Sequence, residues 1–513
     1  MRISPVYLLI VPFSFGLLGL GCQSETSSIP WNTDAAVDAQ ATDAKDAVAD
    51  IGDVEPEDME SEDGDAVDRA CDEPPRVETS DNVTEVAPWP TPEGQVGRTN
   101  RALTPGPTEL NKLWSINLEK GEDGFVVGRH NLYSFRVIER DEDSNPIDYT
   151  NETELLARDK ATGEVIWRVG APGPCSPPAA LPDGGVAFMS DDQVAAYDAS
   201  GERRWRVDAN PRCDEQIAPV EGRKIVLSEW TLNEFGGQAA GFRVMDTEEG
   251  EFVGGDGTLS QTFSPSNRQF TYTSEDLAFH VETERRASDP DHTLHRWSPE
   301  SERELFDIFD DLTWADEEDE LPEQVDLLKP AVGDHFGSIW GRWSSGNRCY
   351  YFFRVPLDPD QARPLMRRPS QPGGGCAKAS FVRPSISGGL VGSFNRLDIV
   401  RFEEDSQEKA NVFRLPEARA VYGQRLVSGS DGRIYFMAGG RPSESNWLYH
   451  GPYTVRSVSD STGNSSASSA CVADAIDDFF YGDVAIEALG DKRVYTRVIR
   501  DEYPGKMKVY GDD

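Results

Sequence analysis

The chain has 513 residues, and its formal net charge of −41 argues against a nucleic-acid partner, because phosphate binding needs a basic face. Its 46 glycines and 34 prolines favour many short strands and turns over long helices. The length fits roughly two to four ordinary domains or one repeat architecture.

The N-terminal segment has the pattern of an export signal. Arg2 precedes an apolar run, Val6 to Leu20, that is too short and too interrupted by proline for a transmembrane span. The run ends at Cys22 and resembles a bacterial lipobox, although Gly19 stands where that motif usually has leucine. The resemblance implies that residues 1–21 are a lipoprotein signal peptide. Cleavage by an ordinary signal peptidase is the alternative.

The lipobox resemblance also implies a membrane anchor and a location. Cys22 would become the lipidated N-terminus of the mature protein. Gln23, rather than aspartate, follows it, which implies the bacterial outer membrane. The expected partner is therefore the membrane itself, with the protein lipid-anchored on the periplasmic or the cell-surface side.

An acidic stretch follows the signal. Residues 23–75 hold seventeen acidic side chains against two basic ones, with almost no apolar residues to bury. The chain stays rich in proline, threonine and glycine up to about Pro107. Residues 22–107 are therefore predicted to be a disordered tether.

A repeated hairpin dominates the next part of the chain. Residues 156–169 and 194–207 each read as a strand, a turn with aspartate and glycine, and a strand ending Gly-Glu-x-x-Trp-Arg-Val, which closes on Trp167 and Trp205. From Leu113 onward, short apolar runs alternate with turns at spacings of roughly 40 to 65 residues. That spacing fits a four-stranded propeller blade.

The repeats predict an all-β fold for residues 113–513, a β-propeller of WD40-like architecture. It would have eight four-stranded antiparallel blades, with seven as the alternative. The last unit, 470–510, has three predicted strands, and residues 113–118 with Trp114 can supply the fourth. Joining both ends of the chain in one blade removes the open sheet edge. The predicted units are 122–169, 175–208, 213–254, 259–308, 328–366, 379–416, 419–457 and 470–510.

The string from Asp159 to Trp167, with a weaker copy at 198–205, resembles the tryptophan-docking repeats of the pyrroloquinoline-quinone-like β-propellers. The resemblance implies that Trp114, Trp167 and Trp205 are structural and pack between blades. Quinone dehydrogenases of this family often carry two adjacent cysteines, a pair that this sequence lacks. We therefore expect no cofactor and no catalytic residue.

Six cysteines remain beside Cys22, and an even set in an exported protein suggests disulfides. The positions favour Cys175–Cys213 and Cys349–Cys376, which leaves Cys71–Cys471. Free, partly buried thiols are the alternative.

One loop has calcium-like spacing, with candidate ligands Asp141, Asp143, Asn145 and Glu152. Pro146 stands where an EF-hand loop needs glycine, and strands rather than helices flank it. An acidic hairpin tip is therefore the preferred interpretation.

The sequence favours a non-enzymatic binding or scaffold module that presents a loop face to a protein or glycan partner. The resembled family includes a lipoprotein that assists outer-membrane β-barrel assembly. An enzyme using the central funnel, either a quinone-dependent dehydrogenase or a hydrolase, is one alternative. A surface adhesin or carbohydrate binder is another.

Overall fold

The computed structural model describes residues 87–91, 94, 101–138 and 153–258, the last with gaps at 172, 175, 191, 212–216, 221–222 and 233–237. Beyond residue 258 it describes the strands given below, the turns at 429–432 and 491–492, and residue 512. All of these residues lie in a compact unit that spans Ala66–Asp513. The described part contains no helix with the length and apolar character needed to span a membrane.

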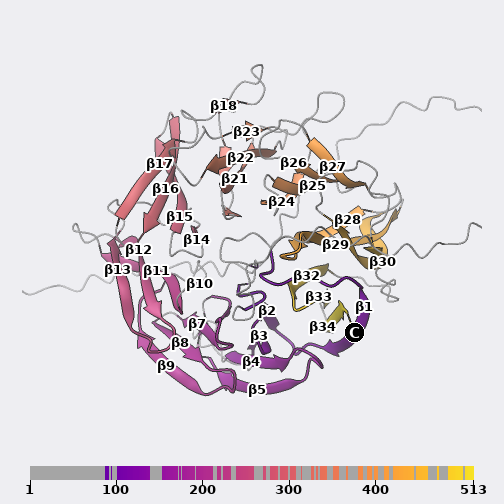
Figure 1. Cartoon of the computed structure of the whole chain (residues 1–513), viewed down its shortest axis with the longest axis horizontal. Helices are drawn as coiled ribbons and strands as arrows, with labels where there is room; N and C mark the ends of the chain where they lie inside the picture. The colour runs from indigo at the N-terminus through magenta and orange to yellow at the C-terminus, as the bar shows by residue number, and fades with distance from the viewer. Residues whose placement is uncertain are drawn as a thin grey trace, which may run out of the picture. The chain divides into compact units, whose positions relative to one another are not determined.

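The described strands form eight sheets, which we number as blades 1–8 in chain order (Figure 1). Blade 1 consists of β2 (Glu122–Val127), β3 (Asn131–Val137), β4 (Thr153–Asp159) and β5 (Val165–Gly170). Blade 2 consists of β6 (Ala179–Ala180), β7 (Val186–Ser190), β8 (Gln193–Tyr197) and β9 (Arg203–Asp208). Blade 3 consists of β10 (Ala218–Val220), β11 (Lys224–Leu232), β12 (Gln238–Asp246) and β13 (Phe252–Thr258). Blade 4 consists of β14 (Phe270–Tyr272), β15 (Ala278–Arg286), β16 (Asp289–Ser298) and β17 (Ser301–Asp307).

Blade 5 is the largest sheet, with β18 (Thr313–Trp314), β19 (Val325–Leu327), β20 (Ala331–Val332), β21 (Phe336–Trp343), β22 (Tyr350–Pro356) and β23 (Leu365–Arg367). Blade 6 consists of β24 (Ala379–Pro384), β25 (Leu390–Phe394), β26 (Asp398–Phe402) and β27 (Lys409–Arg414). Blade 7 consists of β28 (Ala420–Ser428), β29 (Arg433–Ser443), β30 (Asn446–Ser459) and β31 (Cys471–Val472). Blade 8 joins β32 (Asp483–Gly490), β33 (Arg493–Arg500) and β34 (Tyr503–Gly511) to β1 (Asn111–Asn117).

The predicted β-propeller is confirmed, and the described residues form eight blades. Seven are four-stranded and antiparallel, as predicted. Blade 5 differs, because it has six strands and β18 runs parallel to β23. One strand of each blade contacts the corresponding strand of a neighbouring blade. This strand is the first of the blade in chain order, except in blade 5, where it is β20, and in blade 8, where it is β32. The contacts join β2 and β6, β6 and β10, β14 and β20, β20 and β24, β24 and β28, β28 and β32, and β32 and β2. These strands therefore lie nearest the propeller axis.

Blade 8 closes the ring by joining the first described strand, β1, to the last three, β32 to β34. Strand β1 pairs antiparallel with β34, and Trp114 lies opposite Val509 after a bulge. This confirms that the segment around Trp114 supplies the missing fourth strand. Strand β1 is the outermost strand of this sheet and covers the edge that β34 would otherwise leave unpaired.

The predicted disordered tether is wrong at residues 87–91 and 101–107, which are packed against the propeller. The side chains of Trp89 and Ala102 are completely buried, and Trp89 forms a β-bridge with Val127 of blade 1. Proline-rich composition misled the prediction, because proline and tryptophan supply apolar surface that the blades can bury. Residues 1–86, which include the predicted signal peptide and Cys22, lie outside the described part.

Candidate functional site

Three indoles dock successive blades against one another. The Nε1–H of Trp114 in blade 8 donates to the carbonyl of Lys160 in blade 1 at 3.0 Å. Trp167 in blade 1 donates to Ala199 in blade 2 at 2.8 Å. Trp205 in blade 2 donates to Thr247 in blade 3 at 2.9 Å. Each indole therefore reaches the hairpin turn of the blade that follows it.

The turns that receive the indoles share one local structure. Asp159 Oδ1 accepts the backbone N–H groups of Ala161 and Thr162, so the side chain folds the turn around itself. The turn ends at Gly163, whose φ of +77° favours glycine. A Cβ at Gly163 would lie 2.7 Å from the Trp114 ring, so the absence of a side chain also makes room for the indole.

A third copy of this turn lies in blade 3, between β12 and β13. Asp246 Oδ1 accepts the N–H groups of Glu248 and Glu249, and Gly250 has a φ of +72°. Blade 3 has no closing tryptophan of its own, so its turn receives the indole of Trp205 without blade 3 supplying one to the next blade. Asp246 followed four residues later by Gly250 is the part of the motif that receives a tryptophan.

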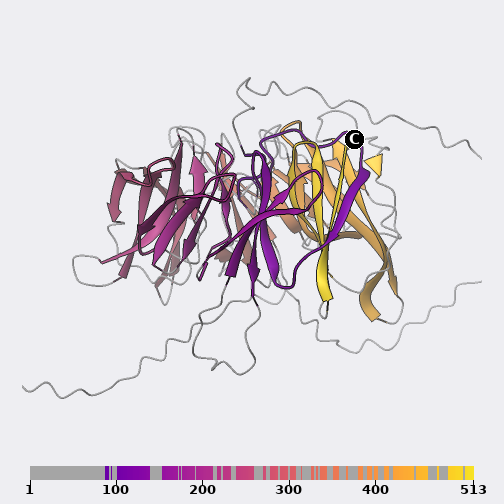
Figure 2. The ribbon, with the colours of Figure 1, turned by 90° about the horizontal axis from the view of Figure 1, so that it is seen from below.

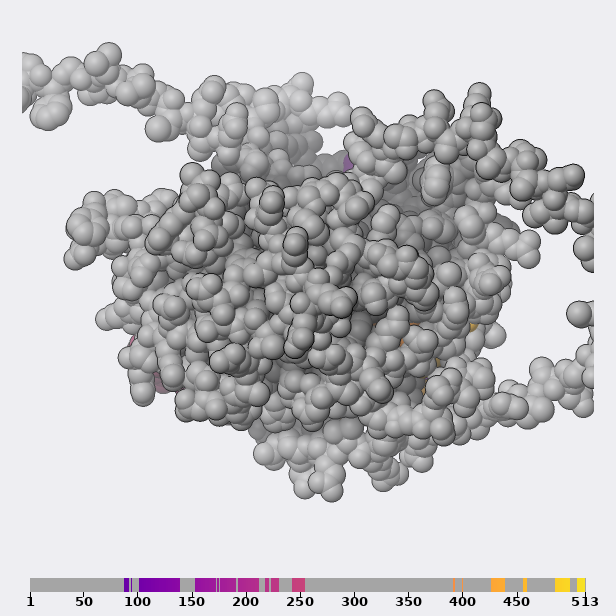
Figure 3. Space-filling model, turned by 90° about the horizontal axis from the view of Figure 1, so that it is seen from above, coloured from indigo at the N-terminus to yellow at the C-terminus, as the bar shows by residue number. Residues whose placement is uncertain are grey.

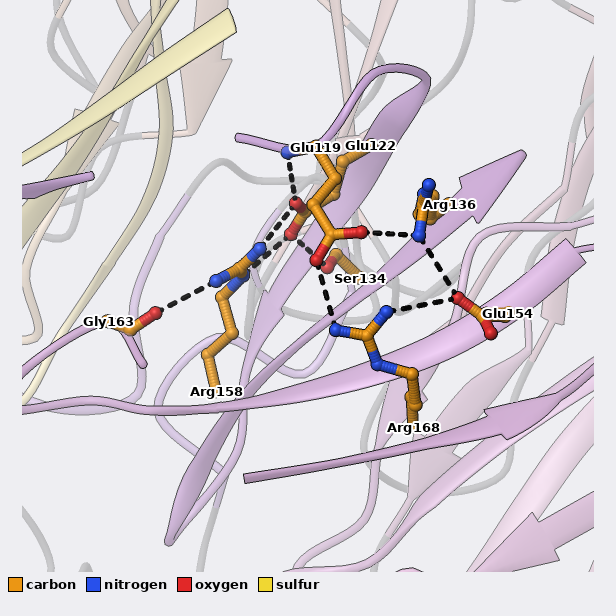
Figure 4. Close-up of polar contacts among 8 residues, drawn as sticks. All are labelled: Glu119, Glu122, Ser134, Arg136, Glu154, Arg158, Gly163 and Arg168. Atoms are coloured by element: carbon orange, nitrogen blue, oxygen red, sulfur yellow. Dashed lines mark hydrogen bonds and ion pairs between the residues drawn. The ribbon is translucent and has the colours of Figure 1, made fainter. Parts of the chain in front are cut away.

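A buried ion pair holds the inner strands of blade 1 together (Figure 4). Arg158 donates through Nε to Glu122 Oε1 at 2.8 Å and through Nη2 to Oε2 at 2.7 Å. The side chains of Arg158 and Glu122 are 5% and 0% exposed. Ser134 also donates to Glu122, and Arg158 donates to the carbonyl of Gly163. The pair therefore links strands β2, β3 and β4 to the turn that receives Trp114.

A second set of charges lies beside the first and is partly exposed. Glu119 accepts from Arg136 and Arg168, and Glu154 faces the same two guanidinium groups (Figure 4). We name these four residues the Glu–Arg cluster. Its two carboxylates and two guanidinium groups balance in charge.

The Glu–Arg cluster lies toward one end of blade 1. Strand β2 begins at Glu122, and its partner there is Arg136 of β3. The other end of β2 is Val127, which pairs with Trp89. The cluster and Trp89 are therefore at opposite ends of the blade.

Another ion pair joins blade 8 to blade 1. Arg497 of β33 contacts Glu487 at 2.7 Å within its own blade and Asp123 of β2 at 2.9 Å. Burial alone would lower the pKa of Arg497, but the carboxylates of Glu487 and Asp123 outweigh it and raise the pKa above its usual value. Arg497 thus stays charged at the interface between the last blade and the first.

The predicted calcium and cysteine sites fall outside the described residues. These are Asp141, Asp143, Asn145 and Glu152, and Cys71, Cys175, Cys213, Cys349 and Cys376, while only the backbone of Cys471 is described. Within the described part, no group of three or more histidine, cysteine, aspartate or glutamate side chains is placed to hold a metal. The pairings Cys175–Cys213, Cys349–Cys376 and Cys71–Cys471 remain predictions.

Figure 2 shows the propeller edge-on from the side where blades 1–3 and 7–8 lie. In the edge-on view from the opposite side, described residues reach the surface only in small areas (Figure 3).

The fold and the docked indoles define a β-propeller with pyrroloquinoline-quinone-like repeats. Residues 111–251 match the family model described as "Outer membrane protein assembly factor BamB". The match covers less than half of the chain and contains all three docking tryptophans. The search of curated proteins gave no match.

Solved structures similar to the chain include propellers of diverse function. The β-propeller domain of the Trilobed protease from Pyrococcus furiosus is 10% identical, with 67% of this chain and 97% of that chain covered and a TM-score of 0.35. The Neurospora crassa Pan2 WD40 domain is 10% identical, with 69% and 97% covered and a TM-score of 0.34. Quinohemoprotein alcohol dehydrogenase from Comamonas testosteroni is 10% identical, with 85% and 82% covered and a TM-score of 0.32. Likenesses this distant assign no activity.

Proposed function

We propose that the protein is a non-enzymatic binding or scaffold module, anchored by a lipid at Cys22 to the bacterial outer membrane. The observation that carries the proposal is the match of residues 111–251 to an outer membrane assembly factor. The matched segment is where three indoles dock blade against blade, which favours a rigid platform for a partner. On this proposal the partner is a protein, and a glycan is the alternative.

We place the partner-facing surface at the end of blade 1 that carries the Glu–Arg cluster. The cluster is partly exposed, and Arg168, the most exposed member, keeps 43% of its side chain accessible. A charge-balanced group of this kind can exchange its internal pairs for pairs with a partner at modest cost, because exposed ion pairs contribute little to stability. The opposite end of the blade is contacted by Trp89.

Site-specific photo-crosslinking in intact cells tests this placement. A photoreactive residue at position 168 lies in the Glu–Arg cluster, and one at position 492 lies at the opposite end, where the Lys492 side chain is 62% exposed. We expect a discrete protein adduct from position 168 and none from position 492. Adducts from neither position, or from position 492 alone, would contradict the proposal.

A second experiment addresses the enzymatic alternative. Pyrroloquinoline quinone and Ca²⁺ are added to the purified full-length protein, and the absorption spectrum is recorded. A binding module should show the sum of the separate spectra. A stoichiometric absorbing complex would overturn the scaffold proposal in favour of a quinone-dependent dehydrogenase.

A further inference from the structure

The chain before the propeller lies across the ends of the strands nearest the axis. Its first limb, residues 87–91, exchanges two hydrogen bonds with β2: Trp89 N to Val127 O at 3.0 Å, and Val127 N to Trp89 O at 2.9 Å. The next residue, Pro90, accepts the N–H of Ala180 in β6 at 2.8 Å. The first limb thus bridges blades 1 and 2.

A second limb, residues 101–108, makes equivalent contacts with blades 7 and 8, on the other side of the boundary where the last blade meets the first. Ala102 N donates to Ser428 O of β28 at 2.7 Å, and Thr104 O accepts from Ser430 N at 3.1 Å. Lys492 N donates to Pro105 O at 3.2 Å, and Asp491 N donates to Thr104 Oγ1 at 3.0 Å. The second limb therefore bridges blades 7 and 8.

The two limbs are joined to each other. Leu103 N in the second limb donates to Pro88 O in the first at 2.9 Å. Gly94 packs so closely on the backbone of Arg101 that a Cβ there would lie 2.7 Å from it. The φ of Gly94, +84°, also favours glycine. A change in one limb therefore has a direct physical route to the other.

Apolar burial adds to these hydrogen bonds. Trp89 and Ala102 are fully buried in one hydrophobic cluster with Val127, Val427 and Tyr435. The Tyr435 hydroxyl donates to Pro107 O at 2.6 Å. The strands reached by the limbs end at the point of contact, since Val127 ends β2 and Ser428 ends β28. The coil that precedes β1 accordingly lies near the ring centre in Figure 1 and along one end of the sheets in Figure 2.

We propose that residues 87–91, 94 and 101–108 form a clasp, one cooperative unit that ties blades 7, 8, 1 and 2 together across the seam where the chain ends meet. The clasp acts in addition to the β1–β34 pairing, which joins strands within blade 8 alone. A ligand approaching the axis from this end has to displace the clasp. The clasp forms whatever partner the protein binds.

Hydrogen exchange on the full-length protein tests the cooperativity. Trp89→Ala perturbs the first limb, and the amides of Ser430 and Lys492 report on the second. We expect their exchange to rise by about tenfold or more, because a cooperative unit opens as a whole. The matched control is Trp205→Ala, which removes a buried indole elsewhere. It should expose the Gly250 amide and leave those of Ser430 and Lys492 protected.

The reverse perturbation keeps the test decisive if Trp89→Ala fails to fold. Thr104→Val removes the Oγ1 acceptor of the second limb while retaining its shape, and the amides of Val127 and Ala180 then report on the first limb. A rise in their exchange supports the clasp. Exchange that rises only within the perturbed limb, in either variant, would show two independent contacts and overturn it.

Discussion

The docking of Trp205 against Gly250 can be tested by a double-mutant cycle. Trp205 is 8% exposed, and Trp205→Ala removes a buried indole and leaves the Thr247 carbonyl without its donor. Buried tryptophan-to-alanine changes cost about 3–5 kcal/mol, so we expect a loss of about 4 kcal/mol in the free energy of unfolding. Trp205→Phe keeps an aromatic ring at this position but loses the N–H donor, and the lost hydrogen bond should cost about 1 kcal/mol.

Gly250→Ala is the second single substitution of the double-mutant cycle. A Cβ there would lie 2.6 Å from Trp205 Cγ, and the φ of +72° strains any L side chain. We expect about 1 kcal/mol from the backbone and about 2 kcal/mol from the clash. In the Trp205→Ala background the two closest contacts, to Cγ and Cδ2, are removed and only the contact to Cβ at 3.0 Å remains. The double variant should therefore lose about 5 kcal/mol instead of the additive 7 kcal/mol.

Urea unfolding of the four proteins, followed by circular dichroism, measures the cycle. A coupling of about 2 kcal/mol between the sites supports the docking geometry. Strict additivity of the two changes, or an unchanged unfolding midpoint for Trp205→Ala, would refute it. Trp167 is only partly buried, so Trp167→Ala should cost less, about 2 kcal/mol.

The other predictions concern buried charge and the membrane anchor. Arg158→Met leaves Glu122 buried without its ion-pair partner, and it should cost about 3–5 kcal/mol in urea unfolding. Arg168→Met changes the partly exposed Glu–Arg cluster and should cost less than about 1 kcal/mol. Equal losses in the two variants would contradict the conclusion that the Arg158–Glu122 pair is the buried one. Burial raises the pKa of the Asp431 carboxyl above its ordinary value of 3.8, so the folded state binds the proton more tightly than the unfolded state. The free energy of unfolding should therefore fall as the pH rises from 3.8 through the folded-state pKa of Asp431. Asp431→Asn should flatten this part of the stability–pH curve, and a wild-type curve without the fall would refute the argument. Cys22→Ala should move the protein from the membrane to the soluble fraction of cells, and continued membrane association would contradict lipid anchoring.

Local turn chemistry made the propeller predictable from the sequence. The side chain of Asp159 and the glycine at position 163 shape a hairpin turn through contacts within five residues, so the repeat is readable without tertiary information. The same local pattern located Trp167 and Trp205, and the position of Trp114 indicated how the ring closes. Blade 5 could not be predicted in the same way, because its short extra strands pair with partners distant along the chain.

The candidate site and the clasp depended on tertiary structure. The clasp was hidden because proline-rich composition resembles a linker, whereas burial of Trp89 and Ala102 depends on strands up to several hundred residues away. The Arg158–Glu122 pair spans 36 positions, and neither residue signals its partner locally. By itself, the sequence determined the repeating unit, since turns and hairpins form from neighbouring residues. The tertiary structure alone decided which carbonyl receives each indole, which charges pair and where the N-terminal segment lies, because those contacts exist only once the blades are in register.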